Sequence, residues 1–191
     1  MQSLFFDEIT YEKVDFSVQK FEKAEYDTCT FINCSFVAID LSNSSFIECE
    51  FISCNFSNTN LKNTSFKNAI FNGCKLVGIL FNECNTFLLS LKFIGCYINI
   101  TSFYKLNLKQ ILFKDCKLIE ADFTEANLTG AVFENGDLSG TIFNSTNLSL
   151  ADFSTAVNFK INPELNNIKG AKFSQQGLSG LLQDYNIEII P

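Results

Sequence analysis

The sequence predicts an all-β solenoid whose coils have four sides. Three observations indicate this fold: a large apolar residue at every fifth position, a small residue two positions before it, and polar residues at most of the other three positions. A period of five matches neither the helix period of 3.6 nor the strand period of 2. A chain that turns a corner every five residues has this period, and four sides make one coil of about 20 residues. Each coil must then bury its large residues against its neighbours.

The five-residue frame covers most of the chain in two parts. From Phe6 to Phe81, sixteen successive positions at intervals of five hold only Phe, Tyr or Leu. The frame then slips by two residues and runs from Leu88, its first inward residue, to Phe153. Residues 20 positions apart are expected to stack on successive coils, so the frame predicts buried ladders of aromatic rings. The predicted core includes Phe103, Phe113, Phe123, Phe133, Phe143 and Phe153.

Two places break this frame. The first is a register break near residues 82–92, where Phe87 and Leu89 fall out of register. Two extra residues favour a β-bulge, and a small projecting loop that contacts a partner is the alternative. The second is an irregular turn near residues 158–167, where Asn162-Pro163 predicts a turn. The frame returns at Ile168.

The cysteines follow the same frame. Cysteines 20 positions apart would stack their sulfurs about 4.8 Å apart, whereas a disulfide prefers a Cβ–Cβ distance of about 3.8 Å. No pair has the C-x-x-C spacing. We therefore expect free, buried thiols in a reducing compartment. All eight hold the small inward position: Cys29, Cys34, Cys49, Cys54, Cys74, Cys84, Cys96 and Cys116.

The composition argues against an enzyme. The chain contains no His, which excludes Ser-His-Asp and Cys-His nucleophiles within it and makes most zinc sites improbable. No glycine-rich phosphate loop follows an expected strand. The carboxylates fall on exposed repeat positions, where nothing would shift their pKa values. We expect no catalytic residue, no cofactor and no metal.

Charge and hydropathy point to a cytoplasmic protein. The net charge of −7 argues against nucleic acid or an anionic membrane as the main partner. No apolar run approaches the 18 residues or so of a membrane-spanning helix. The first eight residues have no basic region of the secretory type.

The last 18 residues, 174–191, change character after a repeat region that covers residues 1–173. Ser174 could cap a short helix whose apolar face carries Leu178, Leu181, Leu182 and Tyr185. Gly177 and Gly180 weaken this helix by itself, so it needs a surface to pack on. Residues 187–189 alternate as in a strand. Capping of the open solenoid explains the helix, and capping together with self-association explains the strand as well.

The repeats resemble a known family. In Ala121-Asp122-Phe123-Thr124-Glu125 and in the next five residues, a small residue, a polar residue, Phe or Leu, and Ser or Thr follow one another. This pattern resembles the pentapeptide-repeat family, and the resemblance implies a right-handed quadrilateral β-helix with a short C-terminal helix and strand.

The C-terminal region narrows the resemblance. The segment from Asn162 to Ser174, with the Gly-Leu-Ser-Gly-Leu-Leu run at 177–182, is similar to the C-terminal module of Qnr-type proteins, especially the chromosomal Qnr-like proteins of Gram-positive bacteria and the MfpA type. The resemblance implies a tail-to-tail homodimer. It also implies binding to DNA gyrase and topoisomerase IV, and protection of these enzymes from fluoroquinolones by mimicry of duplex DNA. The long projecting loops of plasmid-borne Qnr proteins are not evident. The implied dimerisation residues are Leu178, Leu181, Leu182, Tyr185, Ile187 and Ile189.

The charge along the chain is uneven. Residues 1–60 carry net −7, the basic segment 61–118 carries net +6, and the acidic segment 119–159 carries net −6 without a base. The acidic segment spans two coils, roughly 10 Å, so its charge density is close to the one charge per 1.7 Å or so of duplex DNA. In a tail-to-tail dimer its two copies would form an acidic saddle that contacts the topoisomerase. The saddle residues are Glu120, Asp122, Glu125, Glu134, Asp137 and Asp152.

Two alternatives remain open for these charges. Any one of the carboxylates could serve only to solvate the surface. The chain could also be a general β-helical scaffold that binds another protein, with its acidity incidental. A dedicated dimerisation tail favours the topoisomerase hypothesis, because a simple spacer has no need of one.

Overall fold

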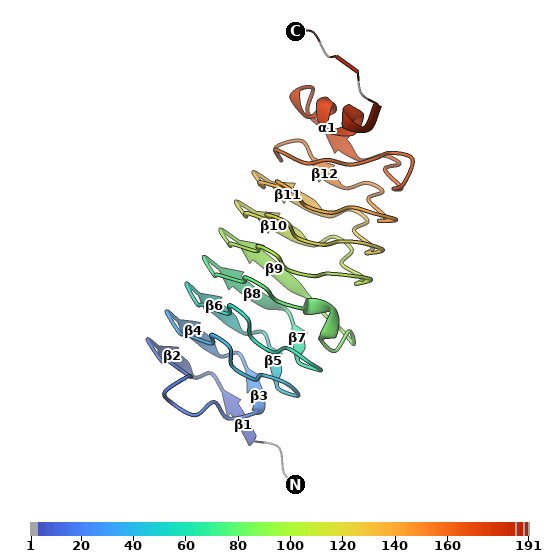
Figure 1. Ribbon diagram of the computed structural model, residues 1–191. Helices are drawn as coiled ribbons and strands as arrows, with labels where there is room; N and C mark the ends of the chain where they lie inside the picture. Colours follow the sequence, from blue (N-terminus) through green and yellow to red (C-terminus); the bar gives the residue numbers. More distant parts are fainter. Residues whose placement is uncertain (1–3, 186, 189, 191) are drawn as a thin grey trace.

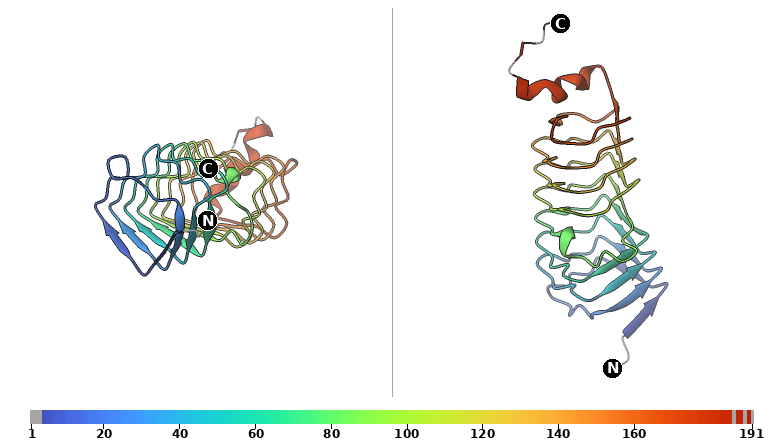
Figure 2. Two further views of the ribbon diagram at one scale, coloured as in Figure 1. Left: turned by 90° about the horizontal axis from the view of Figure 1, so that it is seen from below. Right: turned by 90° about the vertical axis from the view of Figure 1, so that its right-hand side faces the viewer.

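The computed structural model describes residues 4–185, 187, 188 and 190. It confirms the fold class: a parallel β-solenoid with four-sided coils and a short C-terminal helix (Figure 1). Seen along its axis the rod shows the outline of stacked coils, and seen from the side the C-terminal helical segment lies across the last coil (Figure 2).

All strand pairs are parallel and form two sheets along the rod. The four-stranded sheet contains β1 (Leu4–Asp7), β3 (Ala24–Asp27), β5 (Ser45–Ile47) and β7 (Ser65–Lys67). The nine-stranded sheet contains β2 (Thr10–Glu12), β4 (Thr30–Ile32), β6 (Glu50–Ile52), β8 (Ala69–Asn72), β9 (Leu91–Ile94), β10 (Leu112–Lys114), β11 (Val132–Glu134), β12 (Asp152–Phe153) and β13 (Lys172–Phe173).

The four faces of the rod are numbered in chain order. Face 1 carries the four-stranded sheet and continues through bridges such as Asn107 to Asn127, and face 2 carries the nine-stranded sheet. Isolated bridges define the other two. Face 3 includes Lys75, Tyr97 and Lys117, which stand on successive coils, and face 4 includes Asp122.

Most corners turn through one residue in the left-handed region. Among the described residues, twenty-two non-glycine residues and six glycines have positive φ, and they recur mostly at intervals of five. Asn occupies many of these corners, in keeping with its tolerance of this conformation. A backbone reversal every five residues is therefore the physical origin of the sequence period.

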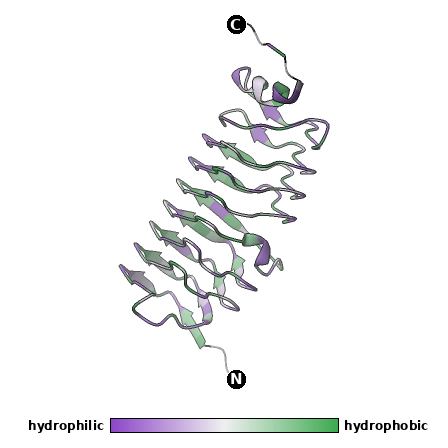
Figure 3. Ribbon diagram, viewed as in Figure 1, coloured by the Kyte–Doolittle hydropathy of each residue, from purple (hydrophilic) through white to green (hydrophobic). Residues whose placement is uncertain are grey.

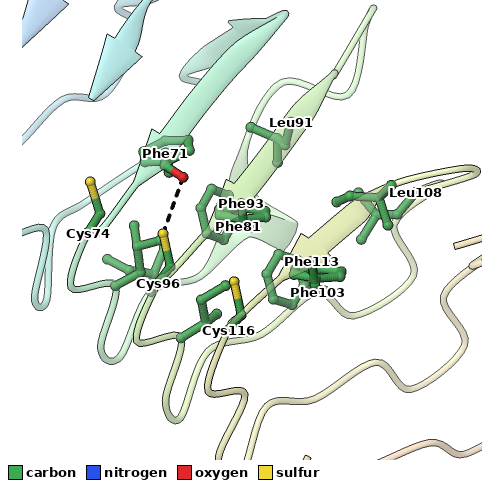
Figure 4. Close-up of a cluster of buried hydrophobic side chains, with 14 of the residues drawn as sticks. Phe71, Cys74, Phe81, Leu91, Phe93, Cys96, Phe103, Leu108, Phe113 and Cys116 are labelled. Atoms are coloured by element: carbon green, nitrogen blue, oxygen red, sulfur yellow. Dashed lines mark hydrogen bonds between the residues drawn. The ribbon is translucent and has the colours of Figure 1, made fainter. Parts of the chain in front are cut away.

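The large inward residues form ladders of stacked rings, as the frame predicts. The rings of Phe103 and Phe123 lie 4.8 Å apart at an angle of 4°, and those of Phe123 and Phe143 lie 5.6 Å apart at 6°. Ladders on adjacent faces meet edge to face, as for Phe113 and Phe123. Figure 4 shows part of this core, and Figure 3 shows the hydrophobic colour on many of the strands along the rod. The six predicted core residues, Phe103, Phe113, Phe123, Phe133, Phe143 and Phe153, are all buried.

The cysteines are free and buried, as expected. Six of their thiols donate to the carbonyl oxygen of a large residue in the coil below, as Cys54 does to Phe31 and Cys96 to Phe71. Thr hydroxyls at the same repeat position make the same bond, for example from Thr101 to Leu76 at 2.6 Å. This position therefore favours small residues that can donate a hydrogen bond.

The structure of the first register break corrects the prediction for one inward residue. Phe71 pairs with Phe93, 22 positions further along the chain, whereas other pairs such as Phe93 and Phe113 are 20 apart. A short 3-10 helix, η1 (Phe81–Glu83), leads into the extra residues. Leu88, expected to point inward, is 63% exposed, and Leu89 packs against the core instead. Leu88 has φ of 56°, so it occupies a corner rather than a face.

The second break and the tail close the C-terminal end. The turn after Asn162 forms as predicted, because its side chain accepts the N–H of Glu164 at 2.8 Å. Phe159 does not fit the five-residue frame, but it is buried and lies against Phe153 and Phe173. A continuous helical segment follows, made of η2 (Gln176–Leu178), α1 (Ser179–Leu182) and η3 (Gln183–Tyr185).

Two glycines let this helical segment approach the end of the rod. A Cβ on Gly177 or on Gly180 would lie 2.8 Å from a carbon of the Phe159 ring. The Ser174 hydroxyl accepts the N–H of Gly177 at 3.1 Å, as its predicted capping role requires. The expected strand at 187–189 is not present in Ile187 and Glu188, and Ile189 lies outside the described residues.

Candidate functional site

The acidic saddle residues surround the rod rather than share one surface. Glu120 and Glu125 stand at corners with φ of 56° and 57°. Asp122 lies on face 4 and Asp137 on face 3. The remaining two, Glu134 and Asp152, lie on face 2 in β11 and β12.

Lysines of neighbouring coils pair with three of the six carboxylates. The Nζ–carboxylate distances are 3.3 Å for Lys105 and Glu125, 2.7 Å for Lys114 and Glu134, and 3.3 Å for Lys172 and Asp152. The hydroxyl of Tyr104 also donates to Glu125. Each lysine is 20 positions from its acid, so it lies outside the segment 119–159. The charge of that segment is therefore partly neutralised on face 2 and at the corner between faces 4 and 1.

The three aspartates also stabilise the backbone. Their carboxylates accept the N–H two residues further on, from Thr124 to Asp122 at 2.9 Å and from Ser154 to Asp152 at 2.9 Å. Asp137 accepts from both Ser139 and the side chain of Asn158.

The same bonds shift two pKa values. Hydrogen bonds lower the pKa of Asp137, chiefly that from Asn158, and that of Asp152, chiefly those from Ser154. Asn makes the same backbone contact elsewhere in the rod, as Asn147 does with Ser149. These contacts were not recognised in the sequence, although the recurring Asp or Asn before each large residue was their signal.

Three carboxylates remain without an ion pair in the described part of the chain: Glu120, Asp122 and Asp137. They lie on faces 3 and 4 and on the corner that joins them, and we call this region the acidic edge. Ile142, half exposed, stands directly above Asp122 on the next coil. Lys117 neighbours Asp137 on face 3 and helps to lower its pKa. Within the described residues, the acidic edge is the part of the acidic segment that forms no salt bridge.

A second group of carboxylates lies at the other end of the rod. Asp7 of β1 stands directly beneath Asp27 of β3, and Glu25 lies two residues before Asp27 in the same strand. Asp40, on face 4, pairs with Lys23, and this contact lowers the pKa of Asp40 to about 2.

The predicted dimerisation residues divide into two groups. Leu181 packs against the core and Leu182 is half-buried, so these side chains help to close the solenoid. Leu178, Tyr185 and Ile187 are exposed, whereas the placement of Ile189 lies outside the described range.

The helical segment is tied to the preceding turn by side chains. Lys160 and Asn162 both contact the carboxylate of Asp184, at 2.6 and 3.0 Å, and the Tyr185 hydroxyl donates to Glu164. Between this segment and the last coil lies a cavity of about 470 Å³ whose lining is about equally polar and apolar and includes Phe159, Gln176 and Gln183. Within the described residues, no helix has the length and apolar character needed to cross a membrane.

Comparison with known proteins shows which family and which solved structures have this architecture. A family model described as the pentapeptide repeat region matches residues 44–118 and 86–173. No curated protein matches the sequence significantly. Among solved structures, trypsin-treated QnrB1, a plasmid-mediated fluoroquinolone resistance protein, is 18% identical with a TM-score of 0.64, over 98% of this chain and 100% of that chain. Full-length QnrB1 is 19% identical with a TM-score of 0.54, over 96% and 100%.

A further solved structure is HetL, a pentapeptide repeat protein involved in heterocyst differentiation regulation from the cyanobacterium Nostoc sp. strain PCC 7120. It is 18% identical with a TM-score of 0.41, over 93% of this chain and 89% of that one. The likeness to QnrB1 extends over the whole rod and concerns the fold. With the family match across the repeats and the four-sided coils, it establishes that this chain belongs to the pentapeptide repeat family.

Proposed function

We propose that this protein is a homodimeric DNA mimic that binds DNA gyrase and topoisomerase IV and protects them from fluoroquinolones. The observation that carries the proposal is the likeness to QnrB1, a fluoroquinolone resistance protein, over 98% of this chain. Under this proposal the protein works in the cytoplasm, without a cofactor, and acts by binding rather than by catalysis.

The acidic edge supplies the charge that such a partner would recognise. Duplex DNA presents a dense row of negative charges, and a DNA-binding groove is correspondingly basic. Glu120 and Asp122 offer such charges without a neighbouring lysine within the described residues, whereas Glu134 and Asp152 are paired. We therefore place the topoisomerase contact on faces 3 and 4 of the acidic segment.

The C-terminal helical segment supplies the dimer contact in this proposal. Leu178 and Tyr185 are nearly half exposed at the end of the rod, and neither belongs to the described hydrophobic core or packs against it. Exposed apolar residues gathered at one end are typical of an interface. Two copies joined there would bring both acidic segments near the centre of one long rod.

The test is a gyrase supercoiling assay in the presence of ciprofloxacin, with purified protein titrated in. We expect supercoiling to recover at low micromolar protein. If the protein neither restores supercoiling with the drug nor inhibits gyrase without it, the proposal is contradicted, and a scaffold for another partner remains. Light scattering tests the dimer separately: Leu178→Ser should give monomers, whereas Val18→Ser, at an exposed position of the first coil at the other end of the rod, should not.

A further inference from the structure

The extra residues near position 87 present an apolar tip on face 1. Asn85 bridges to Ser65 on the coil below, and the N–H of Ser90 donates to the carbonyl of Phe66 at 3.1 Å. The residues between them bulge from the coil, and the Asn85 side chain accepts the N–H of Phe87 at 2.9 Å. Phe87 is 70% exposed and Leu88 63% exposed. Leu89 packs against the core and so anchors the tip.

Two small clefts flank the base of this tip. One cleft of about 210 Å³ opens toward the coil below and includes Ile70, Leu91 and Lys92 in its lining. The other, of about 110 Å³, opens toward the coil above and includes Leu89, Leu108 and Lys109. The first cleft is mainly apolar beside Lys92, whereas the second is mainly polar, with Asn107 and Gln110 beside Lys109. Their sizes suit single side chains rather than a whole small molecule, for which sites of roughly 300–1,000 Å³ are usual.

Lysines border the tip without neighbouring carboxylates. Lys92 and Lys109 line the clefts, and Lys67 ends β7 on the coil beneath. None of the three forms an ion pair within the residues that the structure describes. Glu83, exposed in η1, is the one acid between positions 61 and 114. We call the tip, its two clefts and these three lysines the loop corner.

We propose that the loop corner binds a short, extended, acidic peptide segment of a protein partner, with apolar side chains of that segment seated against Phe87 and in the apolar cleft beside Lys92, and its carboxylates near Lys67 and Lys109. Positive charge around an apolar tip is complementary to an acidic and apolar segment. This partner differs from the topoisomerase surface proposed above, which must be basic. The inference therefore does not depend on that proposal.

The length of the basic segment favours a peptide over a longer polyanion. The basic segment covers about three coils, roughly 14 Å, which is the length of four or five extended residues. The neighbouring segments carry net −7 and −6. A nucleic acid or an anionic membrane extends beyond 14 Å or so and would meet like charge on both sides of the loop corner. A short peptide avoids that repulsion.

Fluorescence anisotropy tests the proposal with a defined probe. The probe is a fluorescein-labelled peptide of about six residues in which aspartate alternates with leucine and phenylalanine. We expect binding to the full-length protein with a Kd of the order of 10 μM at low salt, weakened by added salt because the pairing is electrostatic. Phe87→Ser and the double change Lys67→Gln with Lys109→Gln should each weaken binding at least about tenfold.

Matched controls make the result specific. Val18→Ser changes an exposed apolar residue on another corner, and Lys75→Gln changes an unpaired lysine on face 3. Neither should alter binding, and circular dichroism should show every variant folded. No binding at about 100 μM protein would overturn the proposal, as would equal losses in the control variants. Stronger binding of an anionic phospholipid vesicle or of an oligonucleotide through Phe87 would also overturn it.

Discussion

The ammonium group of Lys114 lies 2.7 Å from the carboxylate of Glu134, one coil above it on face 2. Both side chains are partly exposed, so the pair adds little to stability. Its main consequence concerns the surface potential, because Glu134 does not present a free charge. The same holds for Asp152 beside Lys172. The acidic segment is therefore asymmetric, with its unpaired charge on faces 3 and 4.

This asymmetry predicts which carboxylates matter for gyrase protection. Glu120→Gln together with Asp122→Asn should raise the protein concentration that restores supercoiling by roughly tenfold, because two free charges are lost. Glu134→Gln together with Asp152→Asn removes the same formal charge from paired positions and should have a smaller effect. Equal effects from the two double variants would show that net charge matters rather than the acidic edge.

Asp122 should contribute to stability through its hydrogen bond as well as to binding through its charge. Asp122→Asn keeps an oxygen that can accept the Thr124 N–H, whereas Asp122→Ala removes it. We expect the Ala variant to lose about 1 kcal/mol of unfolding free energy and the Asn variant to lose little. Urea unfolding measures both. Similar stability of the two variants would assign no role to this backbone contact.

Phe123 should be among the residues most costly to truncate. It is fully buried between the stacked rings of Phe103 and Phe143. Phe123→Ala should lower the free energy of unfolding by about 3–5 kcal/mol, and Phe123→Leu by less. Phe87→Ala, at an exposed ring, is the control and should change little. A small loss from Phe123→Ala in urea unfolding would mean that the coils close over the missing ring.

Gly180 should be required for closure of the C-terminal end. An added Cβ would lie 2.8 Å from the ring of Phe159, which is buried and cannot turn away freely. Gly180→Ala should destabilise the helical segment by about 1–3 kcal/mol, seen as faster hydrogen exchange over residues 176–185. Ser179→Ala, at the exposed neighbouring position, should leave exchange nearly unchanged. Slow exchange in Gly180→Ala would show that the helix shifts without loss.

Acid should weaken the fold through Asp40. Its bond from Lys23 holds the pKa of Asp40 at about 2, below the value of about 4 in an unfolded chain. The folded state therefore binds fewer protons, and the stabilisation is present above about pH 4 and lost as the pH falls through 2. Asp40→Asn should reduce the fall in stability over this range, measured by urea unfolding. An unchanged pH dependence would assign it to other carboxylates, such as Asp137 and Asp152.

Much of the fold was predictable because one period governs it. Large residues at every fifth position specify a corner every five residues, and the register of 20 places Phe103, Phe123 and Phe143 in one ladder. The small inward position likewise predicted buried, free cysteines. The inward residue at the register break was not predictable, because two extra residues can bulge in several ways. Packing selected Leu89 over Leu88, since only one of them can reach the core while the other turns the corner.

For the charges of the acidic segment, too, one part was predictable from the sequence and another was not. The number of carboxylates in two coils can be counted from the sequence, and this count gives the charge density that suggested DNA mimicry. Which of these carboxylates are unpaired depends on the stacking of the coils, because stacking brings Lys105, Lys114 and Lys172 from neighbouring coils next to acids 20 positions away. It also decided that Gly177 and Gly180 serve close packing on Phe159, since that contact depends on where the last coil ends. A periodic sequence determines the repeating backbone, whereas contacts between coils depend on side-chain conformation and on the two interruptions of the period.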